Sequence, residues 1–425
     1  WVVNRVHAAN HPYAATAADD LATKMAKMRQ GAFVFYRGTA HLFHADMATL
    51  PPSTSESVKT GWTWIGGDTH LGNFDAARDS TGVAVFRVAD FDEGWLGQHT
   101  WDLRRLAVSL VLTGRDNGLS DADIRTAIEA MVGTYVDAMD GFKGSSAEKS
   151  FKLVKSNTTG VVDDTIAEAD AKSRSQLLDK YTVVSGGRRT LRSLADLGAV
   201  PAGVYGELSA AMPAYIASIA SAKRKPAAFY AVKDIRRKLG SGVGSLGRLR
   251  YYVLIEGASS SSSDDVILEF KQSAASAVAQ AAPGRLAAGS YGGNEGCRVS
   301  RTAKAQLLDA EHLIGCTQAM ALPIFVREKS PYQEDFDPAL LTSAGKLQAA
   351  AGYLSQALAS AHAVSDQDHD AAVVPYSIDK QVIDELVGKR ALKDETLAFA
   401  FDYADQVVLD WAAFAAAYDA GIPLY

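Results

Sequence analysis

Apolar residues recur with the period of a helix through the first and the last parts of the chain. Ser120 is the predicted N-cap of one helix, whose apolar face comprises Ile124, Ile128, Met131, Val132, Tyr135 and Val136. Further helices are predicted as one or two short segments within residues 1–50, and then at residues 163–182, 204–223, near 298–313, from about 337 through Leu354, Leu358 and His362, and near 393–417. Helices are therefore expected to dominate the chain.

Extended runs are concentrated in one central part of the chain. Residues 229–238, 248–256 and 266–271 are predicted to be extended, with the serine run at 258–263 as a hairpin tip and an apolar run at 324–326 following later. A separate strand at residues 62–65 leads into two glycines, where the backbone can turn sharply. This order predicts an α+β fold with a mainly helical large lobe and a small antiparallel β-rich lobe.

The composition is that of an ordinary globular chain. Its 425 residues, 48% hydrophobic and 22% charged, leave room for two lobes. A formal charge of −6 argues against a protein whose main role is to coat nucleic acid, so no nucleic-acid partner is expected. No apolar run approaches the ~18 residues that a membrane-spanning helix needs, so no membrane association is expected either. Oligomeric state is left open.

The two cysteines, Cys297 and Cys316, form no Cys-x-x-Cys pair, so neither a structural zinc site nor a disulfide scaffold is indicated. A single bridge between them would require their Cα atoms to come within about 7 Å. A continuous helix over residues 298–313 would hold them too far apart. Unpaired cysteines are therefore favoured, and a single bridge is left open as the alternative.

Two neighbouring loops carry the residues that point most strongly to chemistry. Residues 67–74 read Gly-Asp-Thr-His-Leu-Gly-Asn-Phe, and Asp90 and Asp92 follow a short strand-like run at 83–89. Hard oxygen ligands in this number suit Mg²⁺, which is usually held by one or two carboxylates together with substrate phosphates. We expect Asn73 and Asp90 to bind Mg²⁺ and Asp68 to accept or orient the proton of an attacking hydroxyl. For Asp92, a second metal and a brace for the loop are left as equal alternatives.

A glycine-rich segment lies between two of the predicted strands. Gly242, Gly244 and Gly247 would let backbone amides approach phosphates without a Cβ in the way, and we include Ser245 in this expected nucleotide contact. A dinucleotide-binding fold would need a helix directly after the glycines. The following residues are strand-like, so that interpretation fails.

These motifs resemble those of a known superfamily. Protein kinases and aminoglycoside phosphotransferases show the same order of catalytic Asp, metal-binding Asn five residues later, hairpin, and metal-binding Asp before an aromatic residue. The chain more closely resembles a bacterial domain family of unknown function, identified by a Phe-Arg-Gly start, a GDxHxxNF loop and a DFDE loop. Here these correspond to residues 35–38, 67–74 and 90–93. The resemblance covers most of the chain and implies that the family belongs to the protein-kinase-like superfamily.

The resemblance implies roles for further residues. Lys271 falls where kinases carry the lysine that pairs with nucleotide phosphates. Val326 lies where the kinase hinge offers backbone groups to adenine. Asp102 is expected to anchor the catalytic loop, and His70 to make a structural hydrogen bond. The cofactors implied are ATP and Mg²⁺.

The order of the two signatures is the reverse of that in kinases, since the catalytic loops precede the lysine strand. The plainest interpretation is a circularly permuted, bilobal protein-kinase-like fold. Residues 1–225 would form a helical lobe with the catalytic and metal-binding loops. Residues 226–335 would form the nucleotide-binding lobe, and residues 336–425 would add the helices that complete the large lobe.

The sequence lacks one element of the kinase pattern, the acid that pairs with the strand lysine. Kinases pair the strand lysine with a helix glutamate, but neither Glu295 nor Glu311 has a spacing that supports this, and Gln272 stands where the family shows an acid after its lysine. Three arginines, namely Arg37, Arg104 and Arg105, are expected to pair with nearby acids rather than to contact an anionic substrate.

The leading functional prediction is an ATP- and Mg²⁺-dependent phosphotransferase acting on a hydroxyl of a small molecule or a protein. Transfer of AMP by the same fold and a nucleotide-sensing pseudokinase are the alternatives. A metallophosphoesterase would need a later Gly-Asp-x-x-Asp, a Gly-Asn-His and further histidine ligands, and the nine histidines do not supply these blocks. The cytoplasm is the default location because ATP is there, although a chain that starts at Trp1 leaves a removed leader open.

Overall fold

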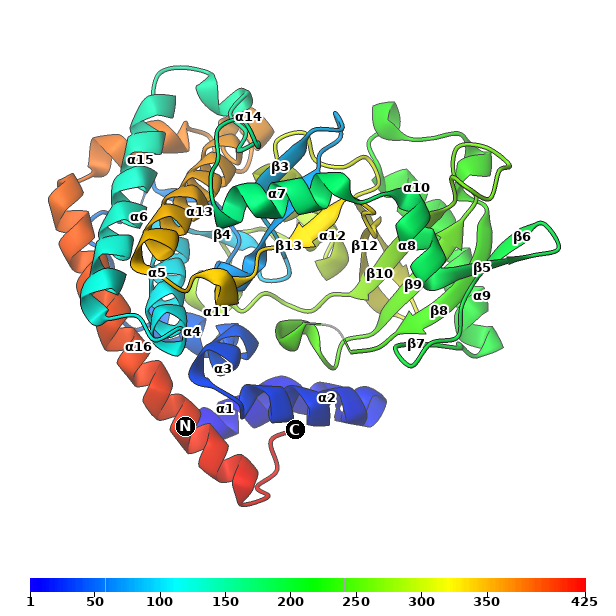
Figure 1. Cartoon of the computed structure of the whole chain (residues 1–425), viewed down its shortest axis with the longest axis horizontal. Coiled ribbons are helices and arrows are strands. Elements are labelled where there is room, and N and C mark those ends of the chain that lie inside the picture. The colour runs from blue at the N-terminus through cyan, green and yellow to red at the C-terminus, as the bar shows by residue number, and fades with distance from the viewer. Residues whose placement is uncertain (58, 241) are drawn as a thin grey trace.

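The computed structural model describes residues 1–57, 59–240 and 242–425 and shows an α+β chain with antiparallel sheets (Figure 1). Long helices form one side of the molecule and a six-stranded sheet the other (Figure 1). The helices of the first side are α5 (His99–Asp116), α6 (Asp121–Phe142), α13 (Ala344–Val364), α14 (Gln367–Asp370), α15 (Ile378–Glu385) and α16 (Lys389–Asp419). None of the described helices is both long enough and apolar enough to cross a membrane.

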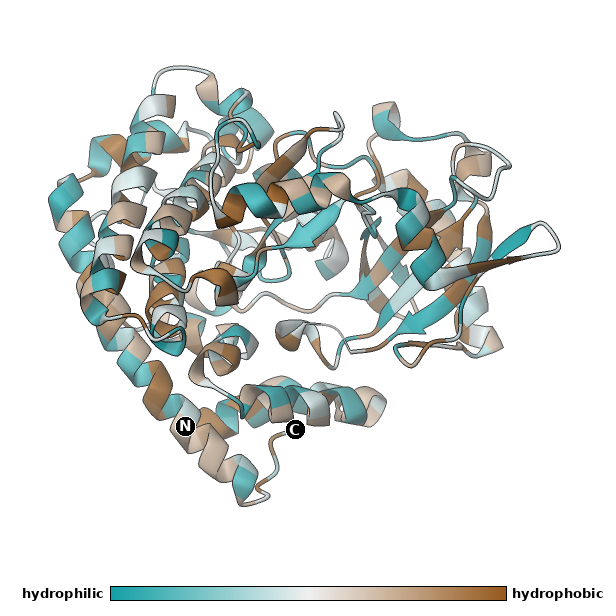
Figure 2. Ribbon diagram, viewed as in Figure 1, coloured by the Kyte–Doolittle hydropathy of each residue, from teal (hydrophilic) through white to brown (hydrophobic). Residues whose placement is uncertain are grey.

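The helical period of the sequence is confirmed where one face is buried. Ser120 caps α6 by accepting a hydrogen bond from the Asp123 amide at 3.2 Å, and every apolar residue predicted for its inner face is buried. That face packs along α13, while α16 packs against α5. In Figure 2 hydrophobic and hydrophilic residues alternate along α16, as expected of a helix that packs by one side.

Two predicted helices are each broken in two. Residues 163–182 contain α7 (Val161–Ala171) and α8 (Arg174–Tyr181), because Ser173 starts a new helix with a reciprocal capping box to Gln176. Residues 204–223 contain α9 (Ala202–Ala210) and α10 (Met212–Ser218), with a proline in the first turn of the second helix.

The central extended runs form one antiparallel sheet. Its strand order is β11-β12-β10-β9-β8-β7, with bounds Gly315–Ala319, Leu322–Glu328, Val266–Gln272, Arg250–Ile255, Val232–Lys238 and Leu197–Gly198. Strand β10 lies in the interior of this sheet, so Lys271 is flanked by Arg250 of β9 and Phe325 of β12. The short α11 (Val278–Ala281) follows β10, and a two-stranded hairpin, β5 (Thr182–Ser185) and β6 (Arg188–Leu191), projects from this end of the molecule (Figure 1).

The cysteine prediction is wrong. Helix α12 (Glu295–Gln306) ends well before residue 313, so the chain returns through a loop and runs back beside the helix as β11. The Cα atoms of Cys297 and Cys316 come within 4.9 Å of each other, and the two residues form a disulfide. Disulfides are rare in the cytosol of most organisms, so the bridge weakens the expectation of a cytoplasmic location.

Small sheets and short helices connect the two sides of the molecule. Strand β1 (Trp62–Ile65) pairs with β4 (Trp95–Gln98), and β2 (Phe74–Arg78) pairs with both β3 (Ala84–Val88) and β13 (Gln333–Asp335). The N-terminal helices lie together beneath these loops (Figure 1): α1 (Val2–Asn10), α2 (Ala14–Met28), α3 (Ala32–Gly38) and α4 (Ala40–Met47). The loops after β1 and β3 are therefore held between the helical side and the sheet.

Candidate functional site

The loop that follows β1 is fixed by a buried carboxylate. Asp102 of α5 accepts hydrogen bonds from the amides of Gly66 at 2.8 Å and Gly67 at 2.9 Å. Its other close partner is His362 Nε2 of α13, at 3.3 Å. Burial raises the pKa of Asp102, but the hydrogen bonds from His362 and the two amides outweigh it and hold this pKa below its usual value. Asp102 thus anchors the loop that delivers Asp68, as the sequence predicted.

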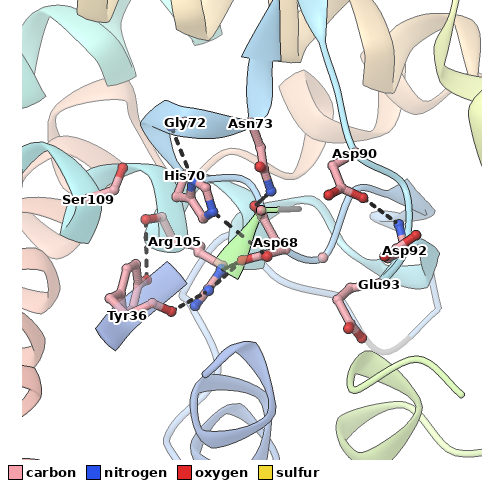
Figure 3. A network of polar contacts seen from close by, with 12 residues as sticks. Tyr36, Asp68, His70, Gly72, Asn73, Asp90, Asp92, Glu93, Arg105 and Ser109 are labelled. Atoms are coloured by element: carbon pink, nitrogen blue, oxygen red, sulfur yellow. Dashed lines mark hydrogen bonds and ion pairs between the residues drawn. The ribbon is translucent and has the colours of Figure 1, made fainter. Parts of the chain in front are cut away.

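Asp68 is a largely buried carboxylate held by one arginine. Arg105 Nε donates to its Oδ1 at 2.6 Å, and Figure 3 shows the two side chains facing each other. His70 Nε2 lies 3.8 Å from the other carboxylate oxygen, while His70 Nδ1 accepts the Gly72 amide at 3.0 Å. Burial, together with the charge of Glu93, outweighs Arg105 and raises the pKa of Asp68 to about 7.

Asn73 and Asp90 are positioned by contacts between the two loops. Asn73 Nδ2 donates to the Asp68 carbonyl at 2.8 Å, which orients the amide and leaves Oδ1 as its acceptor. The Asn73 carbonyl accepts the Ala89 amide at 2.8 Å, so the loops are joined directly before Asp90. Asp90 has a φ of 59°, a left-handed conformation that costs energy in a residue other than glycine. Its side chain is 42% exposed, which leaves the carboxylate accessible.

Lys271 reaches these loops from the sheet. Its Nζ lies 2.7 Å from Asp92 Oδ2 and 3.4 Å from Asp90 Oδ1. Arg248 Nη1 also contacts Asp92, at 3.1 Å. Burial acts to raise the pKa of Asp92, but Lys271 and Arg248 outweigh it and lower this pKa to about 2. Asp92 is therefore an ionised partner of two cations, whereas Asp90 has only the longer contact with Lys271 and a more exposed carboxylate.

Two adjoining cavities meet at Asp90 and Asp92. The smaller, of about 170 Å³, is lined by Asn73, Lys271, Gly242 and Ser245 together with these two carboxylates. The larger, of about 430 Å³, is lined by the same two carboxylates and by Asp68 and Gly244. A third cavity, of about 460 Å³, shares Ala89, Phe91 and Phe325 with the smaller one and is more apolar. Each cavity thus shares lining residues with the smaller one, so the three are neighbours between the sheet and the loops.

Two sequence-predicted contacts lie elsewhere. Gly247 has a φ of 98°, and a Cβ there would come within 2.7 Å of Leu21, so this glycine packs closely on α2 rather than lining a described cavity. Val326 is buried in the sheet and paired on both sides, with Phe270 and Gly315. The pairing with β11 ends at Val326, so Arg327 and Glu328 of β12 are paired only with β10. Ser241, within the glycine-rich segment, lies outside the described residues.

The acid that pairs with Lys271 does not come from a helix. Glu295 pairs with Arg298 at 2.5 Å, and Glu311 pairs with Arg87, so neither reaches Lys271. Arg298 is fully buried and donates to the Asp92 carbonyl at 2.8 Å. Helix α12 thus contacts the loop through an arginine and leaves the lysine to Asp92. Sequence reasoning assigned no role to Arg248, Arg298 or Glu93. Two of them had a signal, since Arg248 directly follows the glycine-rich segment and Glu93 ends the DFDE motif.

The hard oxygen donors of the two loops do not by themselves complete a metal site. In the described part of the chain, no group of three or more His, Cys, Asp or Glu side chains is arranged to hold a metal ion. Asn73 Oδ1 and the Asp90 carboxylate are hard oxygen donors on one cavity, and phosphate oxygens would have to complete the coordination.

Comparison with known proteins places the chain in one family. The model of the family described as "Uncharacterized protein conserved in bacteria (DUF2252)" matches residues 17–417, so the chain belongs to this family. No curated protein and no solved structure matches the chain.

Proposed function

We propose that this member of the bacterial family is an ATP- and Mg²⁺-dependent phosphotransferase with a circularly permuted, kinase-like arrangement. One observation carries the proposal. Lys271 of the sheet lines the same hollow as Asp90 and Asp92, although Asp90 lies 181 residues earlier in the chain. A lysine opposite an amide and carboxylates is a set of groups that can hold a triphosphate and its metal. Local sequence spacing does not explain this proximity.

The three cavities suggest where each part of the reaction takes place. The hollow of about 170 Å³ would hold the phosphates, with Lys271 and the amides near Gly242 as donors. Asn73 Oδ1 and Asp90 would hold Mg²⁺, which supplies neutralisation of the phosphate charge when bound. The neighbouring cavity of about 460 Å³, bordered by Phe91 and Phe325, would take the nucleobase beside residues 327 and 328 of β12.

Asp68 lies on the other side of the carboxylates, in the cavity of about 430 Å³, where an acceptor would bind. The acceptor oxygen forms a bond to the γ-phosphorus, the bond from that phosphorus to the β,γ-bridging oxygen breaks, and ADP leaves with the electron pair. The acceptor proton passes to the Asp68 carboxylate. A base whose pKa is about 7 is well matched to this role at neutral pH.

A thermal-shift titration with ATP, ADP and GTP, each with and without Mg²⁺, tests the proposal. Mass action predicts stabilisation of about 2.7 kcal/mol at a hundredfold excess over Kd. Asn73→Ala should lose the Mg²⁺-dependent part of the shift, while Asn157→Ala, at an exposed loop position, should keep it. Absence of a shift with every nucleotide would refute the proposal. Mass spectrometry of the product separates the two transfer reactions, since the acceptor gains about 80 Da with phosphate and about 329 Da with AMP.

A nucleotide-sensing role is a second candidate, favoured by the Arg105 guanidinium that occupies one oxygen of Asp68. A carboxylate held in this way is less free to act as a base. Asp68→Asn decides between the two, since a sensor keeps nucleotide binding and its output, whereas a transferase keeps binding but loses turnover.

A further inference from the structure

The N-terminal helices contribute a group of basic side chains to the cavity beside Asp68. Lys24 of α2, Arg37 of α3 and His41 of α4 all line the cavity of about 430 Å³. These helices lie against the loops from below in Figure 1. Their basic residues therefore face the space in which an acceptor would sit.

Every carboxylate that lines this cavity is already engaged by a cation. Asp68 is held by Arg105, and Asp92 by both Lys271 and Arg248. Asp90 lies 3.4 Å from Lys271 Nζ. The remaining acid, Glu93, lies 3.5 Å from Arg248 and also accepts a hydrogen bond from a backbone amide at 2.6 Å. None of these acids forms an ion pair with the basic residues of the helices, and Glu93 and Asp68 act on Lys24 only through their charges, which favour its protonated form.

The basic residues of the helices, in contrast, have no acidic partner in the described part of the chain. Lys24 is only 6% exposed, and its Nζ donates to the neutral Asn10 Oδ1 at 3.0 Å. Arg37 forms no ion pair with the described residues, and its Nε is buried without a hydrogen bond. His41 Nε2 is likewise buried without a hydrogen bond. Lys24 thus has only a neutral hydrogen-bond partner, and the Arg37 guanidinium lies 5.7 Å from the centroid of the Phe33 ring. Burial of a positive charge without an acid is costly, so a bound anion would stabilise these groups.

We propose, resting on the phosphotransferase function above, that Lys24, Arg37 and His41 form an anion-binding subsite and that the acceptor is a small hydroxyl compound carrying a carboxylate or a phosphate. The anion would fix one end of the acceptor against the helices. Its hydroxyl would then extend to Asp68 in the same cavity. Arg37 also lines the phosphate hollow, so it lies where the two substrates meet.

The charge states of these residues agree with the subsite. Burial lowers the pKa of Lys24 to about 8, which still leaves the ammonium mostly protonated at pH 7. Burial lowers the pKa of His41 to about 3, so His41 is a neutral hydrogen-bonding group. Two cations and one neutral imidazole can satisfy a single carboxylate or phosphate by charge-assisted hydrogen bonds.

The test measures protection by three anions, namely inorganic phosphate, glycerate and glycerol 3-phosphate. Glycerol serves as the neutral counterpart and sodium chloride as the control for ionic strength. Each probe is titrated in a thermal-shift assay in the presence of Mg²⁺ and a non-hydrolysable ATP analogue, which occupies the phosphate hollow. Lys24→Met removes the charge but retains an unbranched side chain on the inner face of α2. Lys27→Met, the matched control, makes the same change on the same helix at a position that does not line the cavity.

We expect at least one anion to protect the wild type and Lys27→Met, and the Kd of that anion to weaken about tenfold or more in Lys24→Met, as for loss of one charge-assisted hydrogen bond. Lys24→Met should fold at least as stably as the wild type, because it no longer buries an ammonium. If it is unstable, Arg37→Met provides the same comparison. Equal protection of wild type and variant, or no protection beyond that of sodium chloride, would overturn the subsite.

The outcome for the nucleotide separates the two proposals. If the nucleotide binds and no anion protects, the subsite fails and the phosphotransferase proposal stands. If no nucleotide binds in its own titration but anion protection still depends on Lys24, the subsite stands and the phosphotransferase proposal fails.

Discussion

Replacing Lys271 by methionine tests the contact that joins the sheet to the catalytic loops. Lys271→Met retains the length of the side chain in β10 but removes the amine that lies 2.7 Å from Asp92. Arg248 remains as a second cation, at 3.1 Å from the same carboxylate. The variant therefore weakens the ionised state of Asp92 without leaving it entirely unpaired.

The expected loss of stability follows from the pKa of Asp92, whose side chain is only 10% exposed. The pKa falls from 3.8 to about 2 although burial acts in the opposite direction. At about 1.36 kcal/mol per pH unit, this difference corresponds to roughly 2 kcal/mol in favour of the ionised form. Lys271 makes the largest of the cationic contributions, ahead of Arg248 and Arg250. We therefore expect Lys271→Met to lower the free energy of unfolding by about 2 kcal/mol at pH 7.

Urea unfolding of wild type and variant at several pH values measures this loss. The pKa of Asp92 is lower in the folded than in the unfolded chain, so its contribution is fully present above about pH 4 and is lost as the pH falls towards about 2. The difference between the two proteins should therefore be constant from pH 7 to pH 5 and shrink below pH 4. The variant should also lose the thermal shift produced by ATP and Mg²⁺.

Lys155→Met is the matched control, because Lys155 is exposed and forms no ion pair with the described residues. It should leave both the unfolding free energy and the nucleotide shift unchanged. A Lys271→Met protein with wild-type stability at pH 7 and wild-type binding of ATP would refute the reasoning, since the contact would then carry neither energy nor function.

Three further predictions concern the loops and the bridge. Turnover should rise with pH through about 7 as Asp68 loses its proton, and Asp68→Asn should abolish this rise in the pH–rate profile. A wild-type profile that is flat between pH 5 and 9 would count against Asp68 as the base. Replacing Cys297 and Cys316 together by serine opens a bridge of sequence separation 19 and should lower stability by about 3 kcal/mol in urea unfolding under oxidising conditions, whereas an unchanged midpoint would contradict the bridge. Gly67→Ala should destabilise more than Gly82→Ala, because both positions have positive φ but only at Gly67 would a Cβ lie 2.6 Å from a backbone carbonyl; equal melting temperatures would contradict this.

Local sequence was informative wherever structure depends on neighbours along the chain. The N-cap at Ser120, the buried face of α6 and the strand carrying Lys271 follow from residue type and period alone. Asp68 and Asn73 are also close enough in sequence for the side-chain amide of Asn73 to reach the Asp68 carbonyl. Such features need few long-range contacts, so the sequence by itself determined them.

Only the tertiary structure decided which distant groups meet. The early end of α12 let Cys297 reach Cys316, and the packing of α12 brought Arg298 instead of a glutamate to the loop. Lys271 consequently pairs with Asp92, and Lys24 is buried without an acid. These outcomes depend on how separately folded segments share one interior, where burial and charge pairing are settled across the whole molecule. No short stretch of sequence contains that information.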